Sequence, residues 1–423
     1  MTNAASDEDG GPETSPAHPT LSATVIPGPI IVGAGPSGLA TAASLHLLSI
    51  PSVIIERSDG IAHLWRHQSY DRLSLHLPKQ FCELPHLHFP SHHPNYPSKS
   101  DFVSYLVSYA HHFGLRPLFQ CAATAARFDE TDSLWHVAAA RRWPEGREQV
   151  VEFVSPWLVV ATGENAEPVV PEMKGREAFK GGVLHSSEYK NGVDCKGKRV
   201  LVVGCGNSGM EMCLDLCEYG AMPFLSVRSG VHVLPRELLG ISTFRLAMKL
   251  LKWLPVRLVD KILVLLARMV IGDTGKYGLK RPKIGPLELK NATGKTPVLD
   301  VGAFNLIKKG SIKIVSEVES LTRNGAKFAD GREMAFDSVI FATGYRSNVA
   351  HWLKANNKKF RLLHSLQDCD FFSDDGKPKY PFPNGWKGEN GLYCVGFTGR
   401  GLLGASIDAE KVALDIADRW KNL

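Results

Sequence analysis

Short apolar runs, separated by glycine-rich turns and helical stretches, recur along the chain. Residues 30–32 form a β-branched run that predicts a buried parallel strand, residues 39–48 form a helical stretch, and residues 52–55 form a second apolar strand. The turn between the first strand and the helix is made of Gly33, Ala34, Gly35, Pro36, Ser37 and Gly38. This order predicts a βαβ unit whose glycine turn binds a dinucleotide.

The same order of elements returns near the middle of the chain. A predicted strand at residues 199–203 leads to a helix at residues 210–219, and a second strand follows at residues 223–227. The turn between the first strand and the helix consists of Gly204, Cys205, Gly206, Asn207, Ser208 and Gly209. In such a turn the first glycine allows a tight bend, the second lets the backbone approach a pyrophosphate, and the third lets the helix pack closely on the strand. One such turn is weak evidence, but two in the same context favour two nucleotide sites.

Two further strings resemble one another and indicate how the two units are connected. Residues 157–160 are an apolar strand that ends in Ala-Thr-Gly at residues 161–163, and residues 338–341 are a strand that ends in Ala-Thr-Gly at residues 342–344. One string precedes the second unit and the other follows it, so we interpret them as two crossings between domains. The sequence therefore predicts an α/β fold with two dinucleotide-binding (Rossmann-like) domains, the second inserted into the first.

The predicted domain boundaries follow from these strings. Residues 1–28 are rich in Pro, Ser, Thr and Ala and contain no Lys or Arg, which predicts a disordered tail. The first domain is expected at residues 29–165 and again at residues 345–423. The inserted domain is expected at residues 166–344.

The residues that follow the second strand of each unit discriminate between ligands. Glu56 follows the first unit, where a carboxylate accepts hydrogen bonds from a ribose diol. Arg228 and Ser229 follow the second unit, where an arginine binds a 2′-phosphate that a carboxylate would repel. We therefore expect FAD in the first domain and NADPH in the inserted domain, with electrons passing between them.

Charge is unevenly distributed along the chain. The net charge is +6, but residues 245–283 alone hold ten Lys or Arg against Asp260 and Asp273. No nucleic-acid motif accompanies this basic segment, so we expect no nucleic-acid partner. The segment is also too rich in charge to predict a transmembrane span. Two interpretations stay open, namely a helical cover over the substrate pocket with a solvated basic face, and an amphipathic segment that contacts a membrane surface.

Cysteine and histidine usage predicts neither a metal site nor a disulfide framework. The eight cysteines contain no CxxC motif, and no signal peptide precedes them, which predicts a reducing compartment. His86, His88, His92 and His93 cluster among prolines, a pattern typical of an irregular surface loop. We expect a cytoplasmic protein without a bound metal, and peripheral contact with the endoplasmic reticulum stays open.

Longer motifs resemble one known enzyme family. Residues 179–189 (FKGGVLHSSEY) match the FxGxxxHxxx[YF] fingerprint of flavin-containing monooxygenases, and residues 342–345 match that family's second ATG string. A closer resemblance is to the YUCCA-type enzymes of plants, carried by residues 75–85 (LHLPKQFCELP), 161–168 (ATGENAEP), 294–302 (GKTPVLDVG) and 401–405 (GLLGA). The resemblance implies conversion of indole-3-pyruvate to indole-3-acetate, a step of auxin biosynthesis, with NADPH and O2. It also implies oxidative decarboxylation through a C4a-peroxyflavin.

The resemblance also implies candidate site residues. His76 stands where many flavin monooxygenases have an asparagine beside the isoalloxazine ring, ahead of Lys79, and both are candidate catalytic residues together with Asn207. His76 could instead only shape its loop. Trp65 and Arg66 resemble the family's flavin-contacting Trp-Arg pair, although Trp65 also fits an ordinary core position.

Other functions stay open at this stage. A related flavin monooxygenase could act on another aryl α-keto acid or on a nucleophilic nitrogen or sulfur compound. A flavin disulfide reductase shares two dinucleotide turns but needs a cysteine pair near the flavin, where Cys82 stands alone. A non-catalytic sensor that binds FAD and NADPH without turnover is the third alternative.

Overall fold

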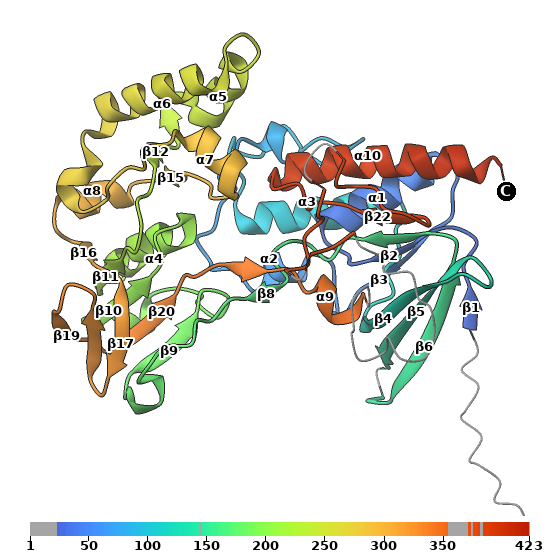
Figure 1. Cartoon of the computed structure of the whole chain (residues 1–423), viewed down its shortest axis with the longest axis horizontal. Coiled ribbons are helices and arrows are strands. Elements are labelled where there is room, and N and C mark those ends of the chain that lie inside the picture. Colours follow the sequence, from blue (N-terminus) through green and yellow to red (C-terminus); the bar gives the residue numbers. More distant parts are fainter. Residues whose placement is uncertain (1–22, 144, 354–370, 374, 381–383, 423) are drawn as a thin grey trace, which may run out of the picture.

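Two parallel sheets organise the chain (Figure 1). The computed structural model describes residues 23–143, 145–353, 371–373, 375–380 and 384–422. The first sheet has the strand order β22-β7-β2-β3, formed by β22 (Leu392–Cys394), β7 (Leu158–Val160), β2 (Ile30–Val32) and β3 (Val53–Ile55). Neighbouring strands pair in parallel throughout, and β7 lies between the C-terminal strand β22 and the N-terminal strand β2.

The second sheet is built only from strands in the middle of the chain. Its order is β16-β11-β10-β20-β9, formed by β16 (Lys313–Val315), β11 (Met222–Ser226), β10 (Arg199–Val203), β20 (Ser338–Phe341) and β9 (Gly182–His185). All of these pairings are parallel. The predicted strands at both glycine turns are thus confirmed, and so is the α/β class.

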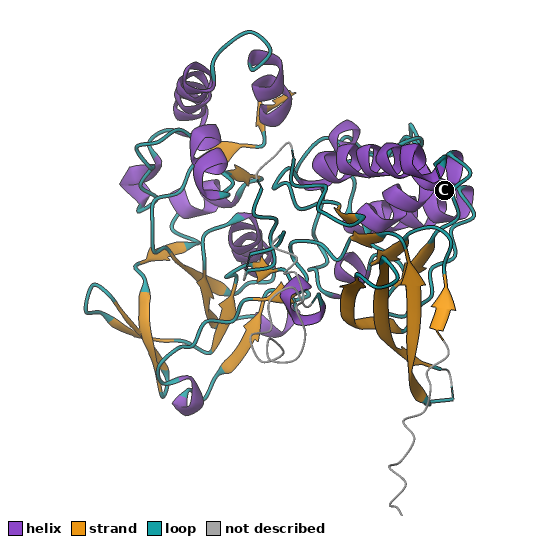
Figure 2. Cartoon of the chain, turned by 45° about the vertical axis from the view of Figure 1, so that its right-hand side comes forward, coloured by secondary structure: helices purple, strands orange, loops and turns teal. Residues whose placement is uncertain are grey.

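The first sheet is covered on both faces. Its side chains alternate between the two faces, so each strand contributes apolar residues to both. Ile31, Ile54 and Val159 face a helical layer of α1 (Pro36–Leu47), α3 (Lys99–His112) and α10 (Gly401–Trp420). Ile30, Ile55 and Val160 face a mixed sheet of order β1-β6-β5-β4, in which β4, β5 and β6 pair antiparallel. Figure 2 shows the helices on one side and these strands on the other. The strands of this sheet are β1 (Ala23–Val25), β6 (Glu148–Ser155), β5 (Leu134–Arg142) and β4 (Cys121–Asp129).

Strand β1 corrects the expected extent of the disordered tail. It lies inside residues 1–28 and pairs in parallel with β6, Ala23 opposite Glu152 and Val25 opposite Val154. All three residues of β1 are exposed, so backbone pairing rather than side-chain burial holds the strand. Composition does not reveal edge pairing of this kind. Residues 1–22 lie outside the described residues.

Smaller elements surround the second sheet and join it to the first. Strands β17 (Val318–Thr322), β18 (Gly325–Phe328) and β19 (Glu333–Ala335) form an antiparallel sheet, and three two-stranded sheets pair β8 (Glu167–Pro168) with β21 (Tyr345–Arg346), β12 (Val233–Pro235) with β15 (Val298–Asp300), and β13 (Glu237–Leu238) with β14 (Ile241–Ser242). The remaining α-helices are α2 (His63–His67), α4 (Asn207–Glu218), α5 (Thr243–Leu250), α6 (Val256–Ile271), α7 (Pro286–Thr293), α8 (Ala303–Lys308) and α9 (Val349–Trp352). Within the described ranges, none of the helices combines the length and apolar character that crossing a membrane requires.

The fingerprint histidine joins the second sheet to the Ala-Thr-Gly string that follows it. His185 Nε2 lies 3.1 Å from the carbonyl oxygen of Gly344, and the backbone N–H of Ser187 points at His185 Nδ1 from 3.1 Å. Since a carbonyl can only accept, Nε2 carries the proton and Nδ1 accepts, which fixes a neutral tautomer. The ring also packs edge-on against Tyr345, with centroids 5.1 Å apart. The contacts of His185 therefore give the fingerprint position a structural role in this fold.

Candidate functional site

The three glycines of the first turn have distinct structural tasks. Gly33 has a φ of +113°, which favours glycine, and a Cβ placed on Gly38 would lie 1.9 Å from the carbonyl oxygen of Gly33. A Cβ on Gly35, in contrast, would meet nothing within 4 Å. Gly35 has an ordinary φ of −82°, so its backbone faces open space without strain. The turn therefore leaves room for a ligand at its second glycine, at the N-terminus of α1.

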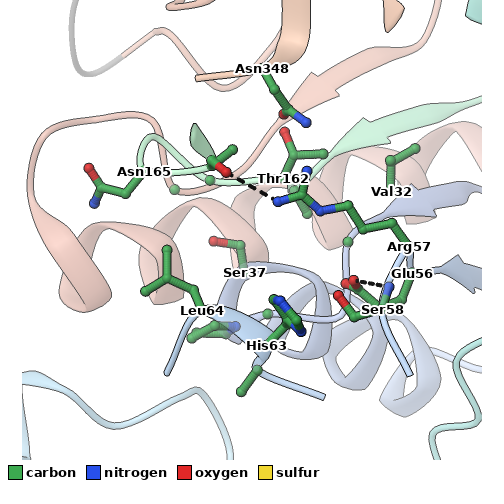
Figure 3. A pocket seen from close by; sticks show the side chains of 18 of the residues that line it. Val32, Ser37, Glu56, Arg57, Ser58, His63, Leu64, Thr162, Asn165 and Asn348 are labelled. Carbon is green, nitrogen blue, oxygen red and sulfur yellow. Dashed lines mark hydrogen bonds between the residues drawn. The ribbon is translucent and has the colours of Figure 1, made fainter. Parts of the chain in front are cut away.

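A cavity of about 430 Å³ opens above this turn (Figure 3). Segments that are far apart in the sequence contribute to its wall. From the first turn and the segment after β3 come Gly33, Gly35, Pro36, Ser37, Glu56, Arg57, His63 and Trp65, and from later segments come Thr162, Glu164, Asn348, Gly401, Leu402 and Ala405. The first residues of α10, which the family resemblance implies near a flavin, thus line the same cavity as the glycine turn.

The backbone of the turn holds Glu56 in place. Glu56 Oε2 accepts a hydrogen bond from the N–H of Ala34 at 2.7 Å, and Oε1 accepts one from the N–H of Ser58 at 2.9 Å. Each carboxylate oxygen has a second lone pair, so the group can still accept from a ribose diol. Arg57, which sequence analysis missed, reaches across the cavity and donates from Nη2 to the carbonyl oxygen of Ala166 at 3.1 Å (Figure 3).

Three buried polar atoms at the cavity wall have no hydrogen-bond partner among the residues that the structure describes. They are His63 Nδ1, Thr162 Oγ1 and Asn348 Oδ1. Burial and the neighbouring His67 lower the pKa of His63, and burial raises the pKa of Glu164. Buried polar atoms normally have partners, so these three fit a polar ligand that completes the wall. Together with Gly35 and Glu56 they match the needs of a dinucleotide.

His63 also belongs to a cluster that sequence analysis did not single out. Side-chain donor atoms of Asp59, His63 and His67 lie within 4.8 Å of one another. Asp59 and His67 are exposed, and exposed groups of this kind often gather without an ion. We assign no metal to the cluster.

The second turn repeats the geometry of the first. Gly204 has a φ of +116°, and a Cβ on Gly209 would lie 2.0 Å from the carbonyl oxygen of Gly204. A Cβ on Gly206 would meet nothing within 4 Å. Cys205 is largely buried, which raises the pKa of its thiol to about 12, so it behaves as a small core residue. Two turns with the same division of tasks indicate two nucleotide sites.

The residues expected to select the second nucleotide lie at the surface. Arg228 and Ser229 are exposed directly after β11. Arg228 Nε lies 3.9 Å from Glu317 Oε1, and three-quarters of the Arg228 side chain is exposed (75%). A side chain so loosely held is free to turn toward a 2′-phosphate.

Asn207 and Ser208 begin α4 and contact neighbouring segments. Asn207 Oδ1 accepts a hydrogen bond from the N–H of Leu299 at 2.8 Å, which ties the second turn to β15. Ser208 lies close to the hydroxyl of Tyr70, which donates to Glu211 Oε2. The contacts of Asn207 thus position the turn.

His76 lies in a buried polar network that joins the two halves of the molecule. His76 Nε2 lies 2.7 Å from Glu211 Oε1, and Tyr70 donates to Glu211 Oε2 at 3.0 Å. Only 7% of the Glu211 side chain is exposed. Glu211 belongs to α4, whereas His76 and Tyr70 precede it by well over a hundred residues. The contact brings the loop of His76 against α4, and the catalytic role of His76 stays a prediction.

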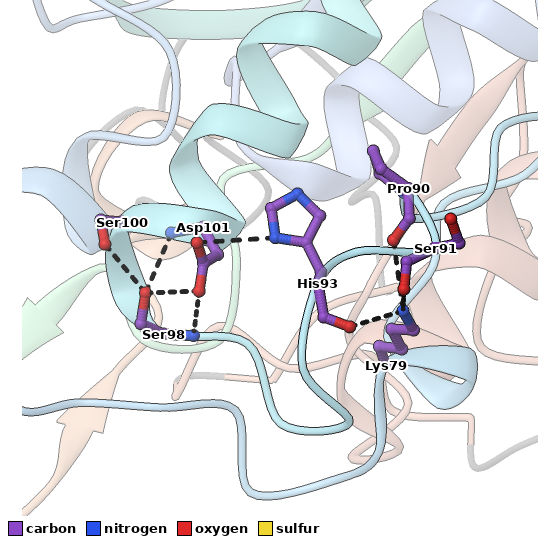
Figure 4. Close-up of polar contacts among 7 residues, drawn as sticks. All are labelled: Lys79, Pro90, Ser91, His93, Ser98, Ser100 and Asp101. Atoms are coloured by element: carbon purple, nitrogen blue, oxygen red, sulfur yellow. Dashed lines mark hydrogen bonds and ion pairs between the residues drawn. The ribbon is translucent and has the colours of Figure 1, made fainter.

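Lys79 directs its ammonium group at backbone carbonyl oxygens of residues 90–93 (Figure 4). Its Nζ donates to the carbonyl oxygens of Pro90, Ser91 and His93 at 3.2, 3.3 and 2.7 Å. Because an ammonium group has three protons, these contacts use its full donor capacity. In the structure Lys79 thus closes the loop, and its catalytic role stays a prediction.

Trp65 and Arg66 point to different places. Trp65 lines the cavity and packs edge-on against Phe102, with centroids 4.6 Å apart. Arg66 is exposed and lines a separate surface depression with His67 and Lys99. The structure therefore places Trp65, but not Arg66, at the cavity.

Comparison with known proteins agrees with these features. The family described as flavin-binding monooxygenase-like matches residues 29–361. The chain is 59% identical over 415 residues to the indole-3-pyruvate monooxygenase YUCCA8 of Oryza sativa, covering 97% of this chain and 94% of that protein. It is 56% identical over 395 residues to the probable indole-3-pyruvate monooxygenase YUCCA4 of Arabidopsis thaliana, covering 93% and 91%.

Solved structures share the fold at much lower sequence identity. A flavin-containing monooxygenase from Stenotrophomonas maltophilia aligns with a TM-score of 0.66 at 19% identity, covering 94% of this chain and 99% of that one. OTEMO in complex with FAD and NADP aligns with a TM-score of 0.65 at 18% identity, covering 96% and 86%. A bacillithiol disulfide reductase from Bacillus cereus aligns with a TM-score of 0.64 at 17% identity, covering 93% and 99%. The fold alone therefore does not choose between a monooxygenase and a disulfide reductase.

Proposed function

Since this chain belongs to the YUCCA branch of the flavin-binding monooxygenase-like family, we propose that it converts indole-3-pyruvate to indole-3-acetate. The observation that carries the proposal is the 59% identity over nearly the whole chain to an indole-3-pyruvate monooxygenase, and the repeated turn geometry, with Glu56 after one turn and Arg228 after the other, supports its two cofactors. A carboxylate suits an unphosphorylated ribose and an arginine suits a 2′-phosphate. FAD accordingly binds at the first turn and NADPH at the second.

The domain arrangement supports electron transfer between these sites. We propose that residues 166–344 form an NADPH domain inserted into an FAD domain of residues 29–165 and 345–423. The strand β22 pairs with β7 of the first sheet, whereas every strand of the second sheet falls between residues 182 and 341. His76, in the first of these parts, contacts Glu211 in the second, and this contact helps to hold the two parts together.

The proposed reaction consumes one O2 and one NADPH for each substrate molecule. The α-keto acid, O2, NADPH and a proton give the shortened carboxylic acid, CO2, NADP⁺ and water. One oxygen atom of O2 enters the acid and the other leaves as water, while the bond between the keto carbon and the carboxylate breaks. Bound FAD supplies the redox and oxygen chemistry.

The chain's own residues bind the cofactor, orient the substrate and keep water out of the site. The N–H groups at the start of α1 face the position of the pyrophosphate, and Glu56 accepts from the ribose. Thr162 and Asn348 offer their unpartnered oxygen atoms to the rest of the cofactor. His76, whose Nε2 lies 2.7 Å from Glu211 Oε1, is the candidate for a hydrogen bond to the substrate.

One observation weighs against the disulfide reductase alternative. Burial raises the pKa of the Cys82 thiol to about 12, which leaves almost no thiolate at neutral pH. The cysteines of the described residues are all free. Free, protonated thiols also fit a reducing compartment, and we propose that the protein acts in the cytoplasm.

Two steps test the proposal and separate its alternatives. Anaerobic mixing of FAD-loaded protein with NADPH should bleach the flavin, and persistence of the oxidised spectrum would leave only the non-catalytic sensor. Aerobic incubation with a panel of aryl α-keto acids, read by mass spectrometry, should then give indole-3-acetate as the preferred product. If another α-keto acid is converted faster, that acid is the substrate instead of indole-3-pyruvate. If only amines or thioethers are turned over, the enzyme is a monooxygenase of nucleophilic nitrogen or sulfur compounds instead.

A further inference from the structure

The exposed face of α6 carries an arrangement that the proposed function does not use. We propose that this face docks the protein on an anionic phospholipid bilayer. We call it the α6 face and define it as Arg257, Leu258, Lys261, Leu265, Arg268 and Met269. The inference does not depend on the substrate or on the cofactors.

Helix α6 carries apolar residues on two opposite sides, one buried and one exposed. Val259, Leu263, Ala267 and Ile271 recur every four residues and are buried, 0%, 1%, 0% and 8% exposed, on the side that packs toward the rest of the protein. Leu258, Leu265 and Met269 lie on the opposite side and are 42%, 60% and 74% exposed. A solvent-facing helix side normally carries polar residues, whereas this apolar stripe has no packing partner in the part of the chain that the structure describes.

Basic residues run beside the apolar stripe. At 100° per residue, Arg257, Lys261 and Arg268 fall together on one flank of Leu258 and Leu265. Arg257 pairs with Glu288 at 3.2 Å, while Lys261 and Arg268 have no ion pair among the residues that the structure describes. An apolar stripe with a basic flank is the arrangement of helices that lie in the headgroup region of a membrane.

The only acidic residue of α6 is turned away from this face. Asp260 is 3% exposed and accepts hydrogen bonds from the N–H groups of Leu287 and Glu288 at 2.8 and 3.0 Å, which caps α7. Residues 245–283 contain ten Lys or Arg against two Asp, a larger positive charge than the +6 of the whole chain. The charge complements an anionic surface and not a neutral one.

The surroundings of α6 fit a bilayer. The helix and its neighbour α5 project at the edge of the molecule, away from the first sheet (Figure 1). Trp253, in the turn between α5 and α6, is 87% exposed, and tryptophan favours the boundary between headgroups and acyl chains. The apolar cluster that holds α5 and α6 together is a separate small core of Ala247, Val259 and Leu263. The face can therefore be altered without changing the two nucleotide turns.

Vesicle sedimentation tests the proposal with the full-length protein. The protein should bind vesicles of phosphatidylcholine containing about one-third phosphatidylserine, and binding should weaken in about 1 M NaCl, where the Debye length falls to about 3 Å. Lys261→Glu with Arg268→Glu should reduce the affinity at least about twentyfold, since each basic side chain contributes roughly fivefold. Leu265→Ser with Met269→Ser should reduce it at least about tenfold.

The control is Leu414→Ser, which changes a residue of similar exposure (59%) on α10. This variant should bind vesicles as the wild type does, and circular dichroism melts should show that all variants fold. Absence of binding to anionic vesicles would overturn the proposal, as would equal loss in the Leu414→Ser control. A wild-type dimer that Leu265→Ser with Met269→Ser dissociates, without vesicle binding, would assign the face to a second copy of the chain instead.

Discussion

At the scale of single residues, Gly35 and Gly206 occupy equivalent positions and provide matched tests of the two nucleotide sites. A methyl group on either meets no protein atom within 4 Å, so each turn itself tolerates alanine. Gly35→Ala should therefore fold normally yet lose FAD, because the methyl group occupies the space of the pyrophosphate. Gly206→Ala should keep its FAD and raise the KM for NADPH at least about tenfold. Flavin absorbance and steady-state kinetics measure both effects, and yellow Gly35→Ala protein with normal turnover would refute the FAD assignment.

Arg228 provides a test of cofactor selectivity. Arg228→Ala should weaken NADPH roughly ten- to a hundredfold, since a charge-assisted hydrogen bond contributes on the order of 1.5–3 kcal/mol. NADH lacks the 2′-phosphate and should be unaffected, and the FAD content should not change. Arg332→Ala is the control, because Arg332 is exposed and already paired with Asp330. An unchanged preference for NADPH over NADH would mean that Arg228 does not bind the phosphate.

His185 predicts a specific dependence of stability on pH. Burial lowers the pKa of His185, and both ring nitrogens are already committed in the neutral form. Protonation in the unfolded chain begins near pH 6.5, so the contribution of His185 is complete above that pH and is lost as pH falls below it. The loss amounts to at most about 1.4 kcal/mol per pH unit.

Thermal melts between pH 5 and pH 8 measure this effect. His185→Ala should be less stable at pH 8 and should show a shallower decline below pH 6.5 than the wild type. His111→Ala, an exposed histidine at the end of α3, should keep the wild-type slope. Identical slopes in wild type and His185→Ala would exclude the neutral tautomer that we assign.

The sequence predicted those site residues that belong to a local motif, but it did not predict those that come together from distant segments. The glycines of both turns follow from a spacing of a few residues, and Glu56 follows from its place directly after the second predicted strand of the unit. Thr162 and Asn348 line one cavity because the pairing of β8 with β21 brings their segments together. Glu211 contacts Tyr70 across 141 positions, a distance at which no local pattern operates.

At the scale of elements, the antiparallel sheet of β4, β5 and β6 was not predicted, although β5 carries a signal. Trp135, Val137 and Ala139 alternate with less buried residues, as expected of a half-buried strand. Several alanines and charged residues weaken that alternation in β4 and β6. The buried runs around both glycine turns are unambiguous because both faces of a parallel sheet are covered.

The loop closed by Lys79 gives a prediction at this scale. Lys79→Met should speed amide hydrogen exchange in residues 86–97 about ten- to a hundredfold, because the carbonyls of Pro90, Ser91 and His93 lose a charged donor. The first turn of α3 should stay protected by the capping box between Ser98 and Asp101 (Figure 4). Lys327→Met, at an exposed pair with Glu319, serves as the control. Lost turnover with unchanged exchange would restore a chemical role for Lys79.

At the scale of the whole molecule, two parallel sheets with equivalent glycine turns share one polypeptide, and His76 and Glu211 are among the residues in contact between their surroundings. The class of the fold followed from two repeated patterns, because each pattern is local and occurs in its full context. The sequence left two interpretations of the basic segment open, a cover over the substrate pocket and an amphipathic segment at a membrane. Charge alone does not say which side of a helix is buried, and the exposed Leu265 and Met269 are the observation that favours the second.

Transfer of oxygen into the product is the central claim, and isotope labelling tests it most directly. FAD-loaded protein is incubated with NADPH, indole-3-pyruvate and ¹⁸O2, and the acid product is weighed by mass spectrometry. The account predicts indole-3-acetate with one ¹⁸O atom in its carboxylate, in proportion to the NADPH consumed. NADPH consumption that yields only hydrogen peroxide, or an acid without ¹⁸O, would contradict it.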